Sequence, residues 1–170
     1  MELPIYIILS SKTHYNPWQV VLYEMIELVD KHNFKDILPL IEAYQAFYDV
    51  KEISNDKIRE FFAKFTGGNN RGAQFLYREG DEAVGFATIY FTYSSALTSK
   101  VAVLNDLYIK PGFRKQGKAR ELITHCLEYG LKHGAARLQW LTEKSNKNAQ
   151  LAYDKIGAKK SEWILYTYAR

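Results

Sequence analysis

The chain has 170 residues, enough for one domain with a single hydrophobic core and too few for a second domain of ordinary size. Hydrophobic residues make up 47% of the sequence and charged residues 25%, the balance of an ordinary soluble globular protein. A formal net charge of +4 helps to attract an anionic ligand, but it is far below the charge density of a dedicated nucleic-acid-binding protein.

Hydrophobic periodicity and turn residues divide the chain into an N-terminal extension, residues 1–19, and one domain, residues 20–170. In chain order, the first half of the domain is predicted to contain a strand at 20–29, a helix at 34–48, a short helix after the N-cap Ser54, and strands at 73–78 and 83–93 joined by the turn Glu79-Gly80-Asp81. The second half is predicted to contain a strand at 101–109, a helix at 117–132 that ends before Gly134, a strand at 136–141, a helix at 146–156 and a strand at 163–168. This mixture predicts a three-layer α/β (α+β) domain, with a partly antiparallel sheet flanked by helices.

The helix predicted at 117–132 carries an apolar stripe that includes the chain's single cysteine. The stripe consists of Ala119, Leu122, Ile123, Cys126, Leu127, Gly130 and Leu131. We therefore expect Cys126 to be a buried small hydrophobe rather than a nucleophile. A single cysteine forms no internal disulfide and predicts a reducing compartment, the cytoplasm. The histidines show no metal-ligand spacing and no apolar run is long enough to cross a membrane, so neither a metal nor a membrane partner is expected.

One segment joins a predicted strand to a helix through a short basic loop. It reads Asn105-Asp106-Leu107-Tyr108-Ile109-Lys110-Pro111-Gly112-Phe113-Arg114-Lys115-Gln116-Gly117-Lys118-Ala119. The first N–H groups of a helix and the positive end of its dipole attract anions, and Gly117 lets a phosphate approach the backbone without a Cβ in the way. Arg114 adds a bidentate donor. The junction fits a phosphate site, although ordinary turn chemistry produces the same pattern.

Two motifs resemble those of the GCN5-related N-acetyltransferases. The first, Arg114-x-x-Gly117-x-Ala119 preceded by Asp106-Leu107-Tyr108-Ile109-x-Pro111, resembles the family's acyl-CoA-binding motif. The second, Asn146-x-x-Ala149-x-x-x-Tyr153-x-x-x-Gly157-Ala158, looks like the family's second signature and follows in the expected order. The resemblance covers roughly residues 20–168. It implies a fold in which two strands of the sheet splay apart at the acyl-CoA site.

The resemblance also implies where acetyl-CoA binds. Leu107, Tyr108 and Ile109 would line its pantetheine arm, and Arg114, Lys115, Gln116, Gly117, Lys118 and Ala119 would hold its pyrophosphate. Asn146 and Ala149 would contact the cosubstrate from the next helix, and Tyr153 would lie near its sulfur.

Acetyl transfer from a thioester to an amine requires a neutral amine, a stabilised oxyanion and a proton for the thiolate. Tyr153 is the candidate acid, because a phenol with a pKa of about 10 is protonated at neutral pH, although its spacing alone is more typical of a core aromatic. Asp106 is the candidate base, and a structural carboxylate bonded to a nearby turn is the alternative. Several relatives carry glutamate where this chain has Asn105, which puts a direct carboxylate base in doubt. A backbone N–H near Ile109 is the candidate oxyanion donor.

The segments 84–93 and 104–107 look similar to the diamine and polyamine acetyltransferase branch, which implies a small primary amine or polyamine as acceptor. Tyr44 and Tyr48, one helical turn apart, would either pack on such an amine or belong to the core. The alternatives are a protein or peptide lysine, an amino acid, or, from another class, a non-catalytic acyl-CoA-binding sensor module. No basic-aromatic pattern indicates nucleic acid as a partner. The aromatic C-terminal strand predicts a homodimer.

Overall fold

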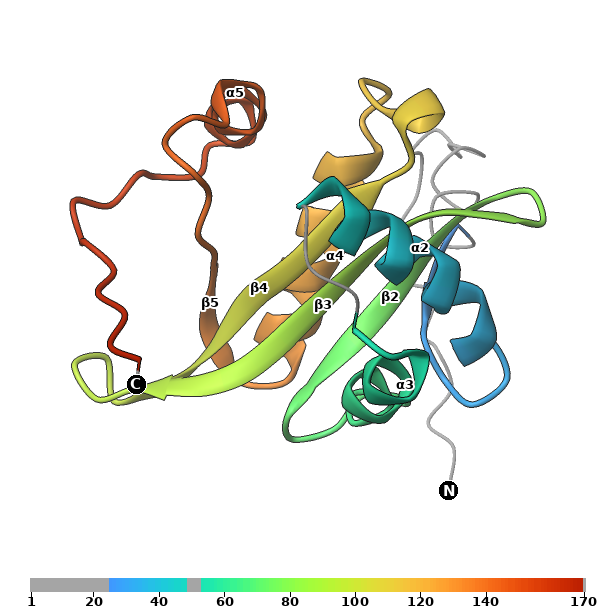
Figure 1. The fold of residues 1–170 in the computed structure, drawn as a ribbon. Helices are drawn as coiled ribbons and strands as arrows, with labels where there is room; N and C mark the ends of the chain where they lie inside the picture. Colours follow the sequence, from blue (N-terminus) through green and yellow to red (C-terminus); the bar gives the residue numbers. More distant parts are fainter. Residues whose placement is uncertain (1–24, 49–52, 170) are drawn as a thin grey trace, which may run out of the picture.

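A five-stranded sheet runs through the molecule (Figure 1). The computed structural model describes residues 25–48 and 53–169. The strands in these ranges are β1 Ile26–Leu28, β2 Gly72–Glu79, β3 Glu82–Ser94, β4 Ser99–Ile109 and β5 Ala135–Gln139. The α-helices are α2 Phe34–Phe47, α3 Asn55–Ala63, α4 Lys118–Lys132 and α5 Lys147–Lys155, and Pro111–Phe113 forms a 3-10 turn.

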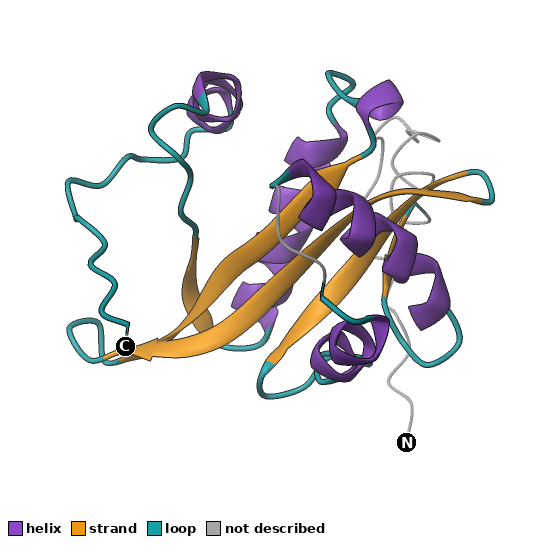
Figure 2. Cartoon of the chain, in the orientation of Figure 1, coloured by secondary structure: helices purple, strands orange, loops and turns teal. Residues whose placement is uncertain are grey.

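The strands lie in the order β1-β2-β3-β4-β5. Neighbours from β1 to β4 are antiparallel, whereas β5 runs parallel to β4 after the α4 crossover. Helices α2 and α3 cover one face of the sheet and α4 covers the other (Figures 1 and 2). The predicted three-layer fold with a mixed sheet is confirmed.

Each face of the sheet has its own hydrophobic cluster, because alternate residues of a strand point to opposite faces. The cluster under α4 includes Phe75, Ala87, Leu104, Leu122 and Cys126. The cluster under α2 and α3 includes Ile41, Phe62, Leu76, Phe86 and Tyr108. Cys126 is fully buried and burial raises the pKa of its thiol, which confirms the prediction of a buried small hydrophobe.

Local signals in the sequence explain several element boundaries. The Ser54 hydroxyl accepts a hydrogen bond from the Lys57 N–H at 3.5 Å and caps α3. Gly80 has a φ of +59° in the two-residue turn between β2 and β3. Arg78 on β2 then ties this hairpin to β1 and α2, through Glu27 at 2.5 Å and Asp36 at 2.6 Å.

The structure corrects the predicted stripe of α4 at its C-terminal end. Leu127 and Leu131 are 37% and 50% exposed, whereas Leu122, Ile123, Cys126 and Gly130 are buried. The helix presents a narrower face to the sheet than its sequence indicates, because the short strand β5 extends the surface under α4 by only five residues.

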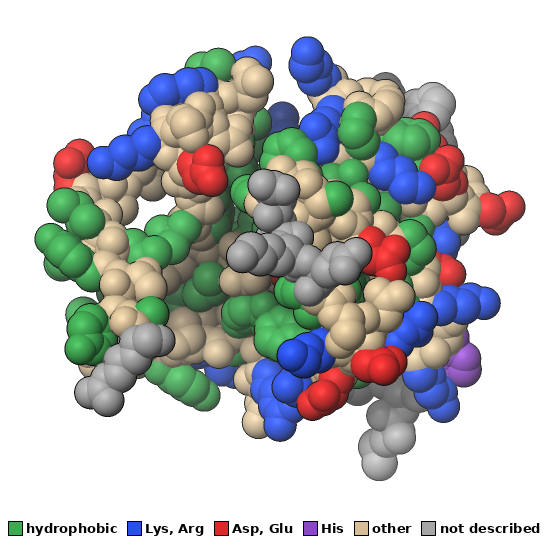
Figure 3. All heavy atoms as spheres, in the orientation of Figure 1, with side chains coloured by type: hydrophobic (Ala, Val, Ile, Leu, Met, Phe, Trp, Pro, Cys, Tyr) green, Lys and Arg blue, Asp and Glu red, His purple; other side chains and the backbone are tan. Residues whose placement is uncertain are grey.

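The predicted strand at 163–168 is wrong. This segment has no regular secondary structure, and Trp163 and Tyr168 are 92% and 89% exposed. A strand requires a neighbour for its N–H and C=O groups, and the described sheet ends at β5. Figure 3 shows hydrophobic side chains along this C-terminal segment and a hollow between the segment and the body of the domain.

The N-terminal predictions fall largely outside the described residues. This holds for the extension at residues 1–19 and for residues 20–24 of the predicted first strand, of which β1 is the described part. No helix in the described ranges is long and apolar enough to cross a membrane.

Candidate active site

Strands β4 and β5 pair along only the first half of β4. The paired positions are Lys100 with Ala135, Ala102 with Leu138 and Val103 with Gln139. β4 then continues to Ile109, and no strand of the described sheet lies along this edge of residues 104–109. The two strands part here, as the sequence resemblance implied.

The exposed edge of β4 presents backbone hydrogen-bonding groups. The Lys110 N–H donates to the Val84 carbonyl on β3 at 2.9 Å. In an antiparallel ladder alternate residues bond to the same neighbour, so the peptide groups of Leu107 and Ile109 point away from β3, toward the open edge. The Arg114 Nε–H donates to the Ile109 carbonyl there at 2.8 Å. This occupies the Ile109 carbonyl but not its N–H, the candidate oxyanion donor.

The loop after β4 ends in an uncapped helix start. Gly117, the N-cap of α4, has a φ of +89°, and no side chain caps the first turn. A Cβ built at Gly117 meets only Glu121 Oε1, at 3.6 Å, so the approach to these N–H groups is open. The free N–H groups, the helix dipole and the backbone geometry fit a pyrophosphate, which is the role predicted for residues 114–119.

The basic side chains of this loop take different positions. The Arg114 guanidinium lies over the rings of Phe47 and Tyr108, at 5.3 and 5.6 Å from their centroids. Lys115 and Gln116 are exposed. Lys118 is buried, and its Nζ pairs with Glu79 at 2.9 Å. Lys118 therefore offers its backbone N–H to an anion, while its side chain is held by Glu79.

A β-bulge places Asp106 beneath α2. The register between β3 and β4 pairs Thr88 with Asp106 but Ile89 with Leu104, so Asn105 is the extra residue. Because of this bulge, Leu104 packs under α4 whereas Asp106 turns to the opposite face, toward Tyr44. Bulges of this kind re-aim side chains next to functional sites.

Asp106 is a buried carboxyl with few partners, being only 5% exposed. Its Oδ1 accepts from Asn105 Nδ2 at 3.0 Å, and its Oδ2 makes no hydrogen bond. Desolvation raises the pKa of Asp106; Asn105 and the nearby hydroxyls of Thr88 and Tyr44 oppose the rise only in part. The two hydroxyls act from nearby, without a hydrogen bond of normal geometry. A carboxylate in this setting accepts a proton more readily than one in water.

Tyr153, on α5, packs against Trp140 just beyond the end of β5, with ring centroids 5.1 Å apart. Desolvation raises the pKa of Tyr153, Tyr48 adds a smaller rise, and the nearby Thr142 side chain lowers it in part. The phenol is therefore protonated at neutral pH, as a general acid must be.

Two tyrosines, Tyr44 in α2 and Tyr48 at the C-terminal cap of this helix, lie near the candidate base and the candidate acid. Tyr48 acts electrostatically on Tyr153, and Tyr44 acts on Asp106. The rings of Tyr44 and Tyr48 lie edge to face, with centroids 5.0 Å apart. Tyr44 thus lies near Asp106, and Tyr48 lies near enough to Tyr153 to raise its pKa.

The remaining predicted residues lie at the start of α5. The Asn146 Oδ1 accepts from the Ala149 N–H at 3.2 Å, so Asn146 is the N-cap of the helix. This cap does not use the Asn146 Nδ2, and Ala149 is partly buried. Their contact with acetyl-CoA stays a prediction.

Sequence reasoning missed two polar residues next to Asp106. Thr88 is opposite Asp106 on β3, and Gln74 is opposite Thr88 on β2; both are fully buried. The signal was available, because each residue interrupts an otherwise apolar strand.

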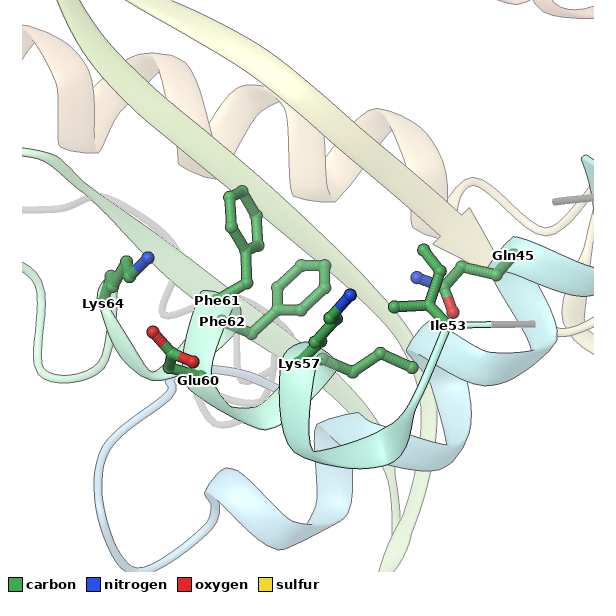
Figure 4. A pocket seen from close by; sticks show the side chains of 8 residues that line it. Gln45, Ile53, Lys57, Glu60, Phe61, Phe62 and Lys64 are labelled. Carbon is green, nitrogen blue, oxygen red and sulfur yellow. The ribbon is translucent and has the colours of Figure 1, made fainter. Parts of the chain in front are cut away.

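A separate cavity of about 460 Å³ lies between α2 and α3 (Figure 4). It is lined by Gln45, Ile53, Lys57, Ile58, Glu60, Phe61, Phe62 and Lys64. None of the predicted catalytic or cosubstrate-binding residues lines it. The candidate site is instead the open edge of β4 and the side chains around it.

Within residues 25–48 and 53–169, no three histidine, cysteine or acidic side chains are arranged to hold a metal ion.

Comparison with known proteins identifies the family. Residues 37–158 match the profile of the Acetyltransferase (GNAT) family. The chain is 31% identical over 121 residues to the uncharacterized N-acetyltransferase YhfO of Bacillus subtilis, covering 71% of this chain and 80% of that protein. It is 36% identical over 82 residues to a thialysine N-epsilon-acetyltransferase of Caenorhabditis elegans, covering 48% of this chain and 51% of that enzyme.

A solved structure supports the same family assignment. The fold superposes with a TM-score of 0.74 on the crystal structure of a probable acetyltransferase that is 26% identical, over 85% of this chain and 97% of the other. The family match covers the splayed strands, the loop that opens α4 and both candidate catalytic residues. The chain is an acyltransferase and belongs to the GNAT acetyltransferase family.

Proposed function

We propose that this protein transfers an acetyl group from acetyl-CoA directly to a primary amine, and that the acceptor is a small amine or polyamine. The observation that carries the proposal is the edge of β4 at residues 104–109 that β5 leaves open, with a buried carboxyl of raised pKa beside it and a protonated phenol across the tyrosine pair. Direct transfer needs these two groups and an oxyanion donor, and it needs no nucleophile from the protein.

Each group has one role in this proposal. Asp106 takes a proton from the acceptor ammonium, and the neutral amine nitrogen then forms a bond to the thioester carbonyl carbon. The Ile109 N–H donates to the oxygen that becomes negative. As the C–S bond breaks, Tyr153 gives its proton to the departing sulfur. The nitrogen, positively charged once the C–N bond has formed, loses its second proton, which restores the Tyr153 phenol and leaves a neutral amide and the CoA thiol. The loop 114–119 holds the pyrophosphate through backbone N–H groups and Arg114.

The small-amine acceptor rests on two supports. The matched nematode relative is named for acetylation of the side-chain amine of thialysine. In this chain, Tyr44 and Tyr48 present aromatic surface between the candidate acid and base, which suits an alkyl amine.

The test is the release of CoA from acetyl-CoA, followed with a thiol reagent, across diamines, spermidine, thialysine, amino acids and lysine peptides. We expect release that depends on a small amine, and a loss of about 30-fold in kcat for Tyr153→Phe with unchanged acetyl-CoA binding. Tyr93→Phe, an exposed tyrosine on β3, is the matched control. Release of CoA with lysine peptides alone would show that the acceptor is a protein or peptide lysine and not a small amine. Tight acetyl-CoA binding without release for any amine would favour a sensor module.

We further propose that the protein is located in a reducing compartment such as the cytoplasm, which the single buried thiol of Cys126 supports. We also propose that it forms a homodimer, which the exposed apolar side chains of Trp163, Ile164 and Tyr166 near the C-terminus support. Light scattering tests the dimer, and a monomeric mass at micromolar concentration would refute it.

A further inference from the structure

Two side-chain contacts hold the first turn of α4 to β2. Glu79 Oε2 accepts from Lys118 Nζ at 2.9 Å, and the Glu121 carboxylate accepts a hydrogen bond from the Tyr77 hydroxyl. Tyr77 and Glu79 are two residues apart on the strand, so they point to the same face of the sheet. Lys118 and Glu121 are three residues apart on the helix and lie on the same side of it. These four residues form one cluster, the α4 anchor, where the helix begins.

The α4 anchor is largely closed to solvent on its inner side. Tyr77 is 1% exposed and the Lys118 side chain 10%, whereas Glu79 reaches in from a half-exposed position at the end of β2. Lys118 Nζ also lies over the Tyr77 ring, 5.5 Å from its centroid. Desolvation and Glu121 raise the pKa of Tyr77, so its hydroxyl is protonated at neutral pH and donates. Contacts shielded from water are screened less than surface pairs, and they fix where the first turn lies.

The loop that precedes α4 has little contact with the rest of the domain. Residues 114–117 are exposed, and Lys115 and Gly117 have left-handed φ values of +63° and +89°. A lysine in this conformation keeps it only where the surrounding structure imposes it. The direction of the loop N–H groups therefore depends on where the first turn of α4 is held.

The N–H groups concerned are those of residues 117–120. The hydrogen-bond ladder of α4 begins with the Glu121 N–H, which donates to the Gly117 carbonyl at 3.1 Å. The four N–H groups before it are the ones that an α-helix leaves without an intrahelical partner. Hydrogen bonds weaken steeply as their angle departs from linear. A first turn that is displaced would therefore bind a pyrophosphate less tightly.

The two acids of the α4 anchor lie beside a site that attracts anions. Glu121 Oε1 is 3.6 Å from the position that a Cβ would take at Gly117. An acid in the first turn stabilises its helix, but it competes with an anionic ligand for the same helix dipole. Tyr77 and Lys118 each hold one of these carboxylates by donating to it. Anchoring of the helix explains why Glu79 and Glu121 are suited to this place in spite of their charge.

We propose that Tyr77 and Glu79 are positioning residues for the cosubstrate. Through Glu121 and Lys118 they hold the first turn of α4 so that the N–H groups of residues 117–120 face the pyrophosphate. This inference rests on the proposed function. The α4 anchor thus acts on the part of acetyl-CoA that carries the phosphates and leaves the chemistry at the thioester unchanged.

The first test measures the Kd for acetyl-CoA by calorimetry. Tyr77→Phe removes the hydroxyl and keeps the ring, and Glu79→Ala removes the partner of Lys118; each should raise the Kd about fivefold. Glu121→Gln keeps an oxygen that accepts from Tyr77 and removes the charge, so it should bind at least as tightly as wild type. Asp81→Asn, at an exposed position in the turn of the same hairpin, is the control.

Three results of this first test would overturn the proposal. They are an unchanged Kd in Tyr77→Phe and Glu79→Ala, tighter binding in Glu79→Ala through the freed ammonium of Lys118, and weaker binding in Glu121→Gln. Circular dichroism verifies that each variant is folded.

The second test separates positioning from a general structural role. S-acetylpantetheine carries the thioester and the pantetheine arm but no pyrophosphate. For Tyr77→Phe and Glu79→Ala, kcat/KM should fall about fivefold with acetyl-CoA and stay at the wild-type value with S-acetylpantetheine, while kcat at saturating acetyl-CoA is unchanged. An equal fall with both donors overturns the positioning role. A wild type that binds no acetyl-CoA refutes the proposed function as well, whereas a wild type that binds it and variants with unaltered Kd refute the anchor alone.

Discussion

The two faces of the sheet differ at adjacent positions of the same strands. Under α4, β2 and β3 bury Phe75 and Ala87. One residue along each strand, under α2 and α3, the sheet buries Gln74 and Thr88 instead, beside Asp106 of β4. One face is apolar, and the other has a polar row through its centre.

This difference between the two faces predicts that one contributes mainly to the free energy of unfolding and the other to the reaction. The apolar face contributes burial, at about 25 cal/mol per Å² of apolar surface. The polar row of Gln74, Thr88 and Asp106 lowers the free energy of unfolding wherever its groups lack hydrogen-bond partners. Its Asp106 end lies on β4, where the edge toward β5 is open. We therefore expect substitutions of the apolar residues under α4 to change the free energy of unfolding, and substitution of Asp106 in the polar row to change the reaction.

The largest expected effect is on the polar face. Asp106→Asn removes the candidate base while keeping the size of the side chain, and kcat should fall about 1,000-fold. The variant should fold and bind acetyl-CoA like the wild type, because the Asp106 side chain makes no contact with the loop 114–119. Steady-state kinetics and calorimetry measure the two quantities. A kcat within a few-fold of wild type would assign Asp106 a structural role.

The apolar face should give the opposite result. Leu122 on α4 is fully buried, and Leu122→Ala should lower the free energy of unfolding by about 3 kcal/mol. Its kcat per folded molecule should equal that of wild type, as measured by urea titration and by activity at low temperature. A lower kcat in a variant shown to be folded would contradict the expectation that the face under α4 affects stability and not the reaction.

Cosubstrate binding should depend on the start of α4. Gly117→Ala places a side chain at a φ of +89° and at the approach to the helix start, so the Kd for acetyl-CoA should rise about tenfold, or about 1.4 kcal/mol. Gly112→Ala is the matched control, since its added Cβ meets no atom within 4 Å. Equal Kd values for the two variants would show that the pyrophosphate of acetyl-CoA does not bind at Gly117.

The smallest expected effect is a pH dependence of stability. Burial raises the pKa of Asp106 above its ordinary value of 3.8, so the folded state holds this proton more tightly than the unfolded state. The stabilising contribution is complete below the unfolded pKa and is lost as the pH rises through the folded pKa. Asp106→Asn should therefore gain stability relative to wild type as the pH rises above the ordinary pKa of 3.8 and through the folded pKa, as measured by urea unfolding. A constant difference would contradict the raised pKa.

Much of the fold followed from local patterns. The caps, turns and periodicity predicted α2, α3 and α4 and the β2–β3 hairpin close to their observed bounds, because Ser54, Gly80 and Gly134 act through their own backbone neighbours. The C-terminal strand did not follow, because an apolar segment becomes a strand only beside a partner. The exposure of Leu127 and Leu131 likewise depends on what lies across from α4.

The sequence by itself determined the candidate acid, the candidate base and the loop for the pyrophosphate, since these residues stand in two spaced motifs. Only the tertiary structure decided how these residues are placed. The bulge at Asn105 turns Asp106 under α2, Glu79 takes the side chain of Lys118, and strand register aligns Gln74 and Thr88 with Asp106. Register and bulges depend on pairing between residues distant in sequence, and local patterns do not contain that information.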